Sequence, residues 1–245
     1  YAVVGNWTNL IITDKGSRGC LICLKGLNRL RMLPGEAGTK QVFAEAGVSL
    51  AELVSLTVRE NLDGFAFAAG IPGSVGGAVR MNAGAYGQSI SEPIQTVTLM
   101  ERTGRLTTKK KTDLCFTYRD FDLPEGTVVV EAAFQFSENP EIRVEKQVKE
   151  ILEDRRRKHP LQYRNAGSIF KNPPKCPAGR LIDEAGLKGF TIGDAMISEQ
   201  HGNFIINRGR ATADDILTLI RQVQKRVARD KGIDLELEVK ILGEI

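Results

Sequence analysis

The chain has 245 residues but only two histidines, one tryptophan and an aromatic fraction of 6%. It contains no run of about 18 consecutive apolar residues, so the sequence offers no candidate for a membrane-spanning helix. The two histidines, His159 and His201, are too far apart in sequence to suggest a metal pair, and we expect no metal. No internal repeat or low-complexity segment is evident. The composition is that of an ordinary globular protein, and the net charge of +4 favours anionic ligands only slightly.

Cysteine is also scarce. The four cysteines (Cys20, Cys23, Cys115 and Cys176) are too few for a disulfide framework in a chain of this length. Cys20 and Cys23 form a C-x-x-C pair inside an apolar strand pattern, but no second pair completes a zinc site. We therefore predict buried structural thiols and a reducing, cytoplasmic compartment.

Short apolar segments separated by glycines dominate the first part of the chain. Strands are predicted near residues 2–4, 10–13, 21–24, 27–33 and 41–44. Ser49 and Glu52 form a capping-box pattern that predicts a helix starting at Ser49. Thr103-Gly104 predicts a hairpin between residues 96–100 and 105–107, and residues 127–136 predict a buried strand.

Helical periodicity becomes stronger after Pro140. Residues 141–158 and 214–229 predict helices, the second one capped by Thr212 and Asp215, and residues 235–242 predict a terminal strand. Because strands and helices do not alternate regularly, the pattern indicates an α+β protein rather than a doubly wound sheet. We place domain boundaries at 1–139, 140–232 and 233–245.

The densest glycine cluster lies in residues 69–78 and includes Gly70, Gly73, Gly76 and Gly77. Backbone without side chains can approach a ligand closely and direct N–H groups at an anion. The spacing matches neither the dinucleotide fingerprint nor the P-loop, and a simple glycine-rich turn is the alternative. A second polar loop, residues 5–9, follows the first predicted strand. Two such loops suit an extended dinucleotide better than a single phosphate.

Residues 69–87 (AGIPGSVGGAVRMNAGAYG), with the loop at residues 5–9, resemble the flavin-binding region of the UDP-N-acetylenolpyruvoylglucosamine reductase family. Later segments are similar to the same family in order and spacing. They are Tyr118-Arg119 and residues 166–173, 185–189, 201–207 and 237–239. The resemblance covers nearly the whole chain.

This resemblance implies FAD and NADPH as cofactors. It implies a domain of the PCMH/vanillyl-alcohol-oxidase type over residues 1–139, a smaller α+β substrate-binding domain over 140–232, and a terminal strand returning to the FAD-binding domain. The implied reaction reduces UDP-N-acetylglucosamine enolpyruvate to UDP-N-acetylmuramate, in cytoplasmic peptidoglycan-precursor synthesis that supports cell shape and division. The compact form of the family, a monomer, and no nucleic-acid or membrane partner are expected.

Reducing a C=C bond conjugated to a carboxylate requires a hydride from a cofactor and a proton from an acid. By the resemblance, Arg119 binds the carboxylate and offsets the charge that develops on it. Ser168 gives the proton, and Glu238 polarises the substrate from the opposite side. Glu236, on the same strand face as Glu238, is the fallback for that role.

The resemblance also implies binding residues. The cofactor-binding set is Gly5, Asn6, Thr8, Asn9, Gly70, Pro72, Gly73, Ser74, Gly76, Gly77, Asn82 and Gly84. The substrate-binding set is Tyr118, Lys171 and Asn172.

Two features depart from the family pattern. The family usually has glycine where Trp7 stands and serine where Thr8 stands, so the indole either stacks usefully or weakens cofactor binding. The chain also opens directly in strand character at Tyr1. We expect a preceding segment that forms one wall of the FAD cleft and pairs with the terminal strand near Leu242. Without it, we expect poor FAD binding and marginal stability.

The sequence also allows two other functions. An FAD-dependent oxidase of a hydroxy acid or sugar would fit the glycine run, although no histidine or cysteine stands near that run in sequence for covalent flavin attachment. A nucleotide- or RNA-binding module could use the basic helix end at residues 155–158, but aromatic stacking residues are few. Those cations are more simply explained as a solvated helix end that complements the helix dipole.

Overall fold

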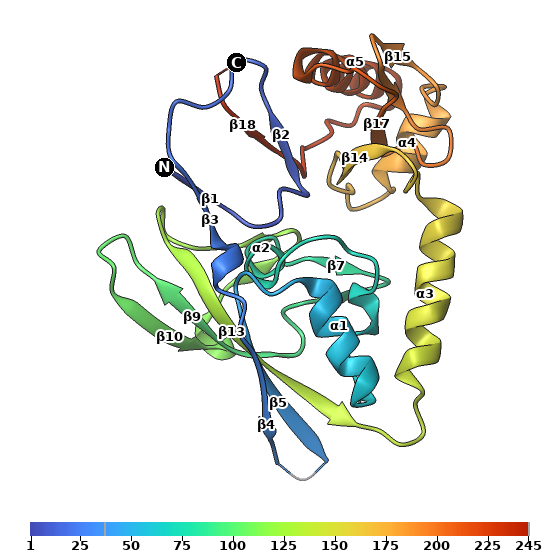
Figure 1. Ribbon diagram of the computed structural model, residues 1–245. Helices are drawn as coiled ribbons and strands as arrows, with labels where there is room; N and C mark the ends of the chain where they lie inside the picture. Colours follow the sequence, from blue (N-terminus) through green and yellow to red (C-terminus); the bar gives the residue numbers. More distant parts are fainter. Residues whose placement is uncertain (37, 245) are drawn as a thin grey trace. The chain divides into compact units, whose positions relative to one another are not determined.

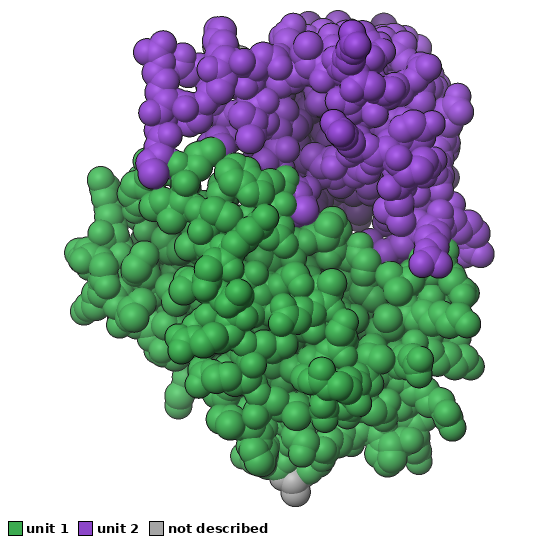
Figure 2. All heavy atoms as spheres, viewed as in Figure 1, with its two compact units in different colours: residues 1–7, 21–154 green, residues 8–20, 155–245 purple. Residues whose placement is uncertain are grey.

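The computed structural model describes residues 1–36 and 38–244, which form two compact units (Figure 2). Unit 1 contains Tyr1–Trp7 and Leu21–Asp154, and unit 2 contains Thr8–Cys20 and the chain from Arg155 onward. Among the described residues, no helix combines the length and the apolar character that a membrane crossing requires. Each unit has its own hydrophobic core.

Unit 1 is built on an antiparallel sheet with strand order β10-β9-β13-β5-β4, and β6 pairs with the far end of β13 (Figure 1). The long central strand is β13 (Val128–Glu138), between β9 (Ile94–Met100) and β5 (Thr39–Glu45). The outer strands are β10 (Leu106–Lys110), β4 (Leu30–Pro34) and β6 (Leu62–Asp63). The predicted hairpin at Thr103-Gly104 is confirmed as the β9–β10 connection. Antiparallel pairing between neighbouring strands confirms the α+β class.

Helices of unit 1 supply the rest of its core. Helix α1 (Leu50–Arg59) begins as predicted, because the Ser49 side chain accepts a hydrogen bond from the Glu52 amide. Helix α2 (Val75–Arg80) follows the glycine run and packs on β13. Helix α3 (Val144–Lys158) packs Val148, Ile151 and Leu152 against the unit 1 core. Unit 1 therefore extends to Asp154, beyond the predicted boundary at 139.

Several short elements complete unit 1. Strand β1 (Ala2–Val4) pairs in parallel with β3 (Leu21–Cys23). Two small hairpins are formed by β7 (Gly84–Ala85) with β8 (Gln88–Ser89) and by β11 (Phe116–Thr117) with β12 (Asp120–Phe121). Single 3-10 turns occur at Leu24–Gly26, Ala66–Ala68 and Lys111–Asp113.

Unit 2 contains an antiparallel sheet in the order β14-β17-β16-β15, together with two helices. Its strands are β14 (Arg164–Ser168), β15 (Thr191–Ile192), β16 (Ala195–Ile197) and β17 (Phe204–Asn207). The helices are α4 (Ala178–Glu184) and α5 (Ala213–Lys231). The predicted cap of α5 is confirmed as a full capping box between Thr212 and Asp215.

The end of the chain is a strand over a shorter range than predicted. Strand β18 (Lys240–Leu242) pairs in parallel with β2 (Leu10–Ile12). Residues 235–239 are not in a regular strand, and Leu237 instead forms an isolated bridge to Phe170. The partner of the terminal strand is thus residues 10–12, a segment that groups with unit 2.

The prediction of buried thiols at the C-x-x-C pair is wrong, because Cys20 and Cys23 are both exposed. The apolar run that contains them forms a strand paired only with β1, and a two-stranded ribbon buries little of either face. All four cysteines are free.

Asp14 ties the segment 8–20 to helix α5 within unit 2. Its Oδ1 accepts from the Ala213 amide at 3.0 Å and its Oδ2 from the Asp214 amide at 2.9 Å. These two backbone hydrogen bonds hold the pKa of Asp14 below its ordinary value of 3.8. The carboxylate therefore stabilises the fold above an unfolded-state pKa of about 3.9, and this stabilisation is lost as the pH falls through the lower folded pKa.

We expect Asp14→Asn to lower the melting temperature at pH 7, because an amide at this position carries no charge to interact with the first turn of α5. The difference from wild type should narrow below about pH 4, where the native carboxyl becomes neutral as well. Thermal unfolding of both proteins between pH 7 and pH 3 measures this. A melting difference that does not change with pH would contradict the assignment.

Candidate functional site

The two polar loops predicted to hold the cofactor meet in unit 1. Gly5 lies against Ser74 so closely that a Cβ at residue 5 would overlap the Ser74 hydroxyl. Gly76 is equally constrained, since a Cβ there would stand 2.7 Å from the Ala46 Cβ. Glycine at both positions lets segments distant in sequence pack together without displacing Ser74 or Ala46. Gly5 and the glycine run therefore lie side by side.

The expectation that several amides of the run point at one anion needs correction. The amides of Val75 and Gly76 donate to the carbonyls of Val48 and Ala46 at 2.8 and 2.9 Å. The Gly77 amide donates to the Ser74 hydroxyl at 3.4 Å. These three amides therefore already have acceptors within the protein. Anion contacts are therefore expected from residues 70–74, which include Gly70 at φ 74° and Gly73 at φ 147°.

The Tyr118-Arg119 pair forms the turn between β11 and β12, and three side chains fasten this turn to the end of the glycine run. Arg80 donates to Asp120 Oδ1 at 2.7 Å. Asn82 Nδ2 donates to the Thr117 carbonyl at 2.8 Å, and Arg119 Nη2 donates to the Gly84 carbonyl at 2.8 Å. The half-buried Arg119 is thus held beside residues 80–84, next to the segment predicted to bind the cofactor.

Backbone strain is concentrated in this part of unit 1. Five non-glycine residues of the described chain have positive φ, and four of them belong to the predicted site segments: Trp7 (61°), Asn82 (40°), Tyr86 (54°) and Arg119 (58°). Such conformations are unfavourable by about 1–3 kcal/mol each and persist only where the surroundings enforce them. They cluster at ligand-binding sites, which supports the assignment of this region.

Asn82 provides a test of whether these residues suit a flavin. It is 8% exposed, and in the described structure its Oδ1 is buried with no hydrogen-bond partner. A buried unsatisfied acceptor is unfavourable unless a ligand donates to it. FAD carries donors in its ring system and sugar, and the glycine backbone permits close approach. The residues present therefore fit the cofactor.

The backbone of Trp7 lies in the left-handed region at φ 61°, a conformation that suits glycine, the residue that the family resemblance implies here. Its side chain is 38% exposed and it is the only tryptophan in the chain. We expect FAD to quench Trp7 fluorescence on binding, because the indole stands on the loop that carries Gly5 and Asn6. Titration of FAD into the protein, with Trp7→Phe as the emission blank, measures this. Saturable FAD binding without a change in emission would show that Trp7 does not face the cofactor.

A separate cavity of about 530 Å³ in unit 1 does not suit a diphosphate. Its lining includes the carboxylates of Asp63, Glu150 and Asp154 together with Tyr86 and Gln88. The Tyr86 hydroxyl lies 3.1 Å from Asp154 Oδ2. Three carboxylates would repel an anionic ligand, so we assign the cofactor to the glycine run.

Unit 2 holds the other two predicted catalytic residues. Ser168 is the last residue of β14, directly after a β-bulge in the pairing with β17. Gly167, at φ 79°, makes this bulge possible, and its amide is held by Asn165 Oδ1 at 3.0 Å. Bulges are over-represented next to active sites, and the half-buried Ser168 directly follows this one.

Glu238 lies on the segment that crosses this strand end. Its amide donates to the Ile169 carbonyl at 2.8 Å, next to the Phe170–Leu237 bridge. Glu238 is half-buried, whereas the Glu236 side chain is 72% exposed and bound to Lys171 Nζ at 2.6 Å. The pairing of Lys171 with Glu236 favours Glu238 as the functional glutamate.

Three further residues of the predicted site, Asn172, Asn9 and Thr8, belong to unit 2. Asn172 Oδ1 accepts from the Ala178 amide at 3.0 Å, at the start of α4. Asn9 belongs to unit 2, where its Nδ2 donates to the Glu238 carbonyl at 3.2 Å and its own carbonyl accepts from the Lys240 amide at 3.0 Å. Thr8 also groups with unit 2. These two residues are thus placed with the terminal segment.

The two histidines lie close together, and the basic helix end is partly buried. The ring centroids of His159 and His201 are 5.4 Å apart, and both rings contact Phe204. Their edge-to-face packing is aromatic, and the described residues contain no cluster of three or more metal-binding side chains. Arg155 is only 8% exposed, so the basic helix end is solvated only from Arg156 onward.

The structure thus brings Arg119 to the glycine run within unit 1 and the Ser168 strand end to Glu238 within unit 2. Sequence reasoning gave no role to Arg80, which fastens the Tyr118-Arg119 turn, or to Asn203, which holds the segment after Ser168. Asn203 lies within residues 201–207, one of the segments that resemble the family, and directly precedes an apolar strand. That position was the sequence feature that could have indicated a role for it.

Comparison with known proteins covers the whole chain. Residues 1–109 match an FAD binding domain family, and residues 159–242 match the C-terminal domain of UDP-N-acetylenolpyruvoylglucosamine reductase. The UDP-N-acetylenolpyruvoylglucosamine reductase of Syntrophus aciditrophicus is 47% identical over 244 residues, which are 100% of this chain and 78% of that protein. The one from Agathobacter rectalis is 42% identical, with 99% of this chain and 80% of the relative covered.

A solved structure agrees with these relatives. The crystal structure of UDP-N-acetylenolpyruvylglucosamine reductase (MurB) from Thermus caldophilus is similar with a TM-score of 0.85 and 36% identity. The match covers 98% of this chain and 84% of that one. With its cofactor run, its Tyr118-Arg119 turn and its Ser168 strand end all inside these alignments, the chain belongs to the UDP-N-acetylenolpyruvoylglucosamine reductase family.

Proposed function

We propose that this chain reduces UDP-N-acetylglucosamine enolpyruvate to UDP-N-acetylmuramate, with NADPH as the reductant, in peptidoglycan-precursor synthesis. It is an FAD-dependent oxidoreductase. The observation that carries the proposal is the 47% identity to a reductase of this name along the whole chain. The alternative, an oxidase of a hydroxy acid or sugar, is not favoured.

When bound, FAD would supply the redox chemistry, which is the relay of a hydride from NADPH to the substrate. In unit 1 we propose that it is held by Gly5, Asn6, Gly70, Pro72, Gly73, Ser74, Gly76, Gly77, Asn82 and Gly84. In unit 2 we propose further contacts from Thr8 and Asn9. The close approach of Gly5 to Ser74 and the unsatisfied Oδ1 of Asn82 support the unit 1 part of this set.

Arg119 is proposed to bind the carboxylate of the enolpyruvyl group. Addition of a hydride to the terminal carbon moves negative charge onto that carboxylate, and a guanidinium can hold both of its oxygens. The bond from Arg119 Nη2 to the Gly84 carbonyl fixes part of the side chain in advance. A cation that is already in place avoids reorganisation as the charge develops, which is a large contribution to catalysis.

Ser168 is proposed to donate its Oγ proton to the carbon that bears the ether oxygen. A hydroxyl is a weak acid, but the carbanion-like carbon is a strong base, so the transfer runs downhill. Glu238 is proposed to hydrogen-bond the substrate from the opposite side and polarise it. The β-bulge before Ser168 and the hydrogen bond from the Glu238 amide to Ile169 support placing both on one substrate.

Substrate-binding roles are proposed for Tyr118, Lys171 and Asn172. Tyr118 is 52% exposed in the turn that carries Arg119, with the Arg119 guanidinium 5.2 Å from its ring centroid. Lys171 is oriented by Glu236 and offers positive charge to the diphosphate. We also propose a cytoplasmic location, consistent with four free cysteines, and a monomeric state.

The experiment that tests the function is turnover of UDP-N-acetylglucosamine enolpyruvate by the purified protein with FAD and NADPH. We expect stoichiometric NADPH oxidation and UDP-N-acetylmuramate formation, identified by mass spectrometry. Light scattering on the same sample tests the monomer. Oxidation of a hydroxy acid with consumption of oxygen, in the absence of the nucleotide sugar, would support the oxidase instead.

A further inference from the structure

The backbone that follows Ser168 is clamped by one buried side chain, that of Asn203. Asn203 is 3% exposed and immediately precedes β17. Its Oδ1 accepts from the Phe170 amide at 2.9 Å, and its Nδ2 donates to the Phe170 carbonyl at 2.8 Å. Its own carbonyl accepts from the Ile169 amide at 2.9 Å. One asparagine thus satisfies three polar groups of the two residues after Ser168.

The opposite side of the same segment is held by the chain end. The Glu238 amide donates to the Ile169 carbonyl and the Lys171 amide donates to the Glu236 carbonyl, both at 2.8 Å. Regular pairing of β14 with β17 is interrupted between Asn165 and Ser168. Because the ladder is irregular on the N-terminal side of Ser168, the direction of its side chain depends on the clamp that follows it.

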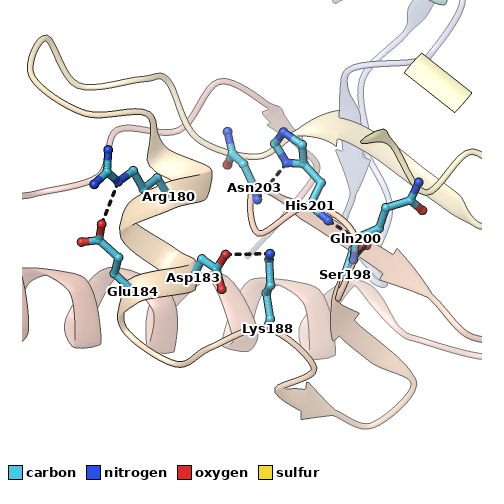
Figure 3. A network of polar contacts seen from close by, with 8 residues as sticks. All are labelled: Arg180, Asp183, Glu184, Lys188, Ser198, Gln200, His201 and Asn203. Atoms are coloured by element: carbon cyan, nitrogen blue, oxygen red, sulfur yellow. Dashed lines mark hydrogen bonds and ion pairs between the residues drawn. The ribbon is translucent and has the colours of Figure 1, made fainter. Parts of the chain in front are cut away.

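Asn203 is itself held in place. The backbone amide of Asn203 donates to His201 Nδ1 at 3.2 Å. The Ser198 hydroxyl accepts from the backbone amides of Gln200 and His201 at 3.1 and 3.4 Å (Figure 3). Burial, and then the positive charge of Lys188, lower the pKa of His201, so that the imidazole stays neutral and Nδ1 can accept. A Cβ at Gly179 would stand 3.4 Å from the Asn203 amide nitrogen, so α4 packs closely on this turn.

We propose that Asn203 is a positioning residue for the proton donor Ser168. It acts through the backbone N–H and C=O of Phe170, whose hydrogen bonds to the Asn203 side chain set the position of residues 168–170 against Glu238. This inference rests on the proposed function. It assigns Asn203 to proton delivery and not to the transfer of hydride from NADPH.

The test uses stopped-flow measurement of the two half-reactions in Asn203→Asp and Asn203→Ala. Asp keeps the acceptor for the Phe170 amide but replaces the donor to the Phe170 carbonyl with a charged oxygen. We expect substrate reduction to slow by about 10- to 100-fold, since small displacements of reacting groups have effects of this size. Reduction of the flavin by NADPH should stay within about twofold of wild type. Far-UV circular dichroism confirms that the assayed variants are folded.

Asn207→Asp is the matched control. Asn207 ends the same strand and clamps the 207–211 turn, because its Oδ1 accepts from the Gly209 and Ala211 amides at 2.8 and 3.1 Å and its Nδ2 donates to the Ala211 carbonyl at 3.3 Å. We expect this variant to lose thermal stability but to keep both half-reactions. A similar slowing in Asn207→Asp would mean that general loosening of unit 2, and not position of Ser168, is responsible.

The decisive readout is the double variant Ser168→Ala/Asn203→Ala. If Asn203 acts through Ser168, replacing Asn203 should change the rate of substrate reduction by less than about twofold in a protein that already lacks the serine hydroxyl. Additive effects, or equal slowing of both half-reactions in Asn203→Asp, would overturn the inference. Failure of the wild-type protein to reduce the nucleotide sugar would instead overturn the proposed function.

Discussion

Ser168→Ala is expected to slow reduction of the nucleotide sugar by at least about 100-fold, the low end for a positioned acid, while NADPH reduces the bound flavin at the wild-type rate. The reason is that the hydroxyl acts only on the substrate, where it neutralises the charge that the added hydride leaves. It takes no part in the reduction of the flavin by NADPH. Ser168 follows the Gly167 bulge and precedes the buried Ile169, so alanine should fit without moving the backbone.

The measurement is single-turnover absorbance of the flavin, first with NADPH alone and then with the nucleotide sugar. Ser55→Ala is the control, because this exposed hydroxyl bonds only its own helix at the Ala51 carbonyl. It should leave both steps unchanged. Equal loss of both steps in Ser168→Ala would remove Ser168 from the acid role.

Arg119→Lys is expected to lower kcat/KM for the nucleotide sugar by about 10²- to 10³-fold, the range found when a group that stabilises developing charge is lost. Lysine presents a point charge and cannot hold a planar carboxylate through two parallel donors. It would also lose the bond geometry that links Arg119 Nη2 to the Gly84 carbonyl at 2.8 Å. The flavin should still be reduced by NADPH.

Arg105→Lys is the matched control for this substitution. Arg105 is an exposed arginine in the β9–β10 hairpin, paired with Glu101 at 2.8 Å, and exposed pairs of this kind contribute little. Its replacement should leave kcat/KM unchanged. An Arg119→Lys protein with wild-type kcat/KM would show that the carboxylate is bound elsewhere.

Elements with local signals were predicted well. The Ser49 cap of α1, the Thr212–Asp215 box of α5 and the Thr103-Gly104 hairpin depend on residues within a few positions of each other. Elements that depend on distant partners were predicted poorly. The terminal strand was predicted over 235–242 but pairs only over Lys240–Leu242, because β2 offers three residues to pair with.

Burial could not be deduced from local pattern either. The run around Cys20 and Cys23 is as apolar as a core strand, but the single neighbouring strand β1 leaves both thiols exposed. His159 and His201 both contact Phe204, a proximity that no local pattern in the sequence marks. Whether a side chain is covered depends on what the rest of the chain places over it.

The amino-acid sequence by itself determined the family and the cofactor and predicted the candidate catalytic residues, since ordered motifs and local caps are properties of short segments. Only the tertiary structure decided how those residues are held. Gly5 against Ser74, Arg119 against Gly84 and Asn203 against Phe170 are contacts between segments far apart in the chain. Such contacts form because buried polar groups need partners and close packing needs missing side chains, and neither partner is marked in the local sequence.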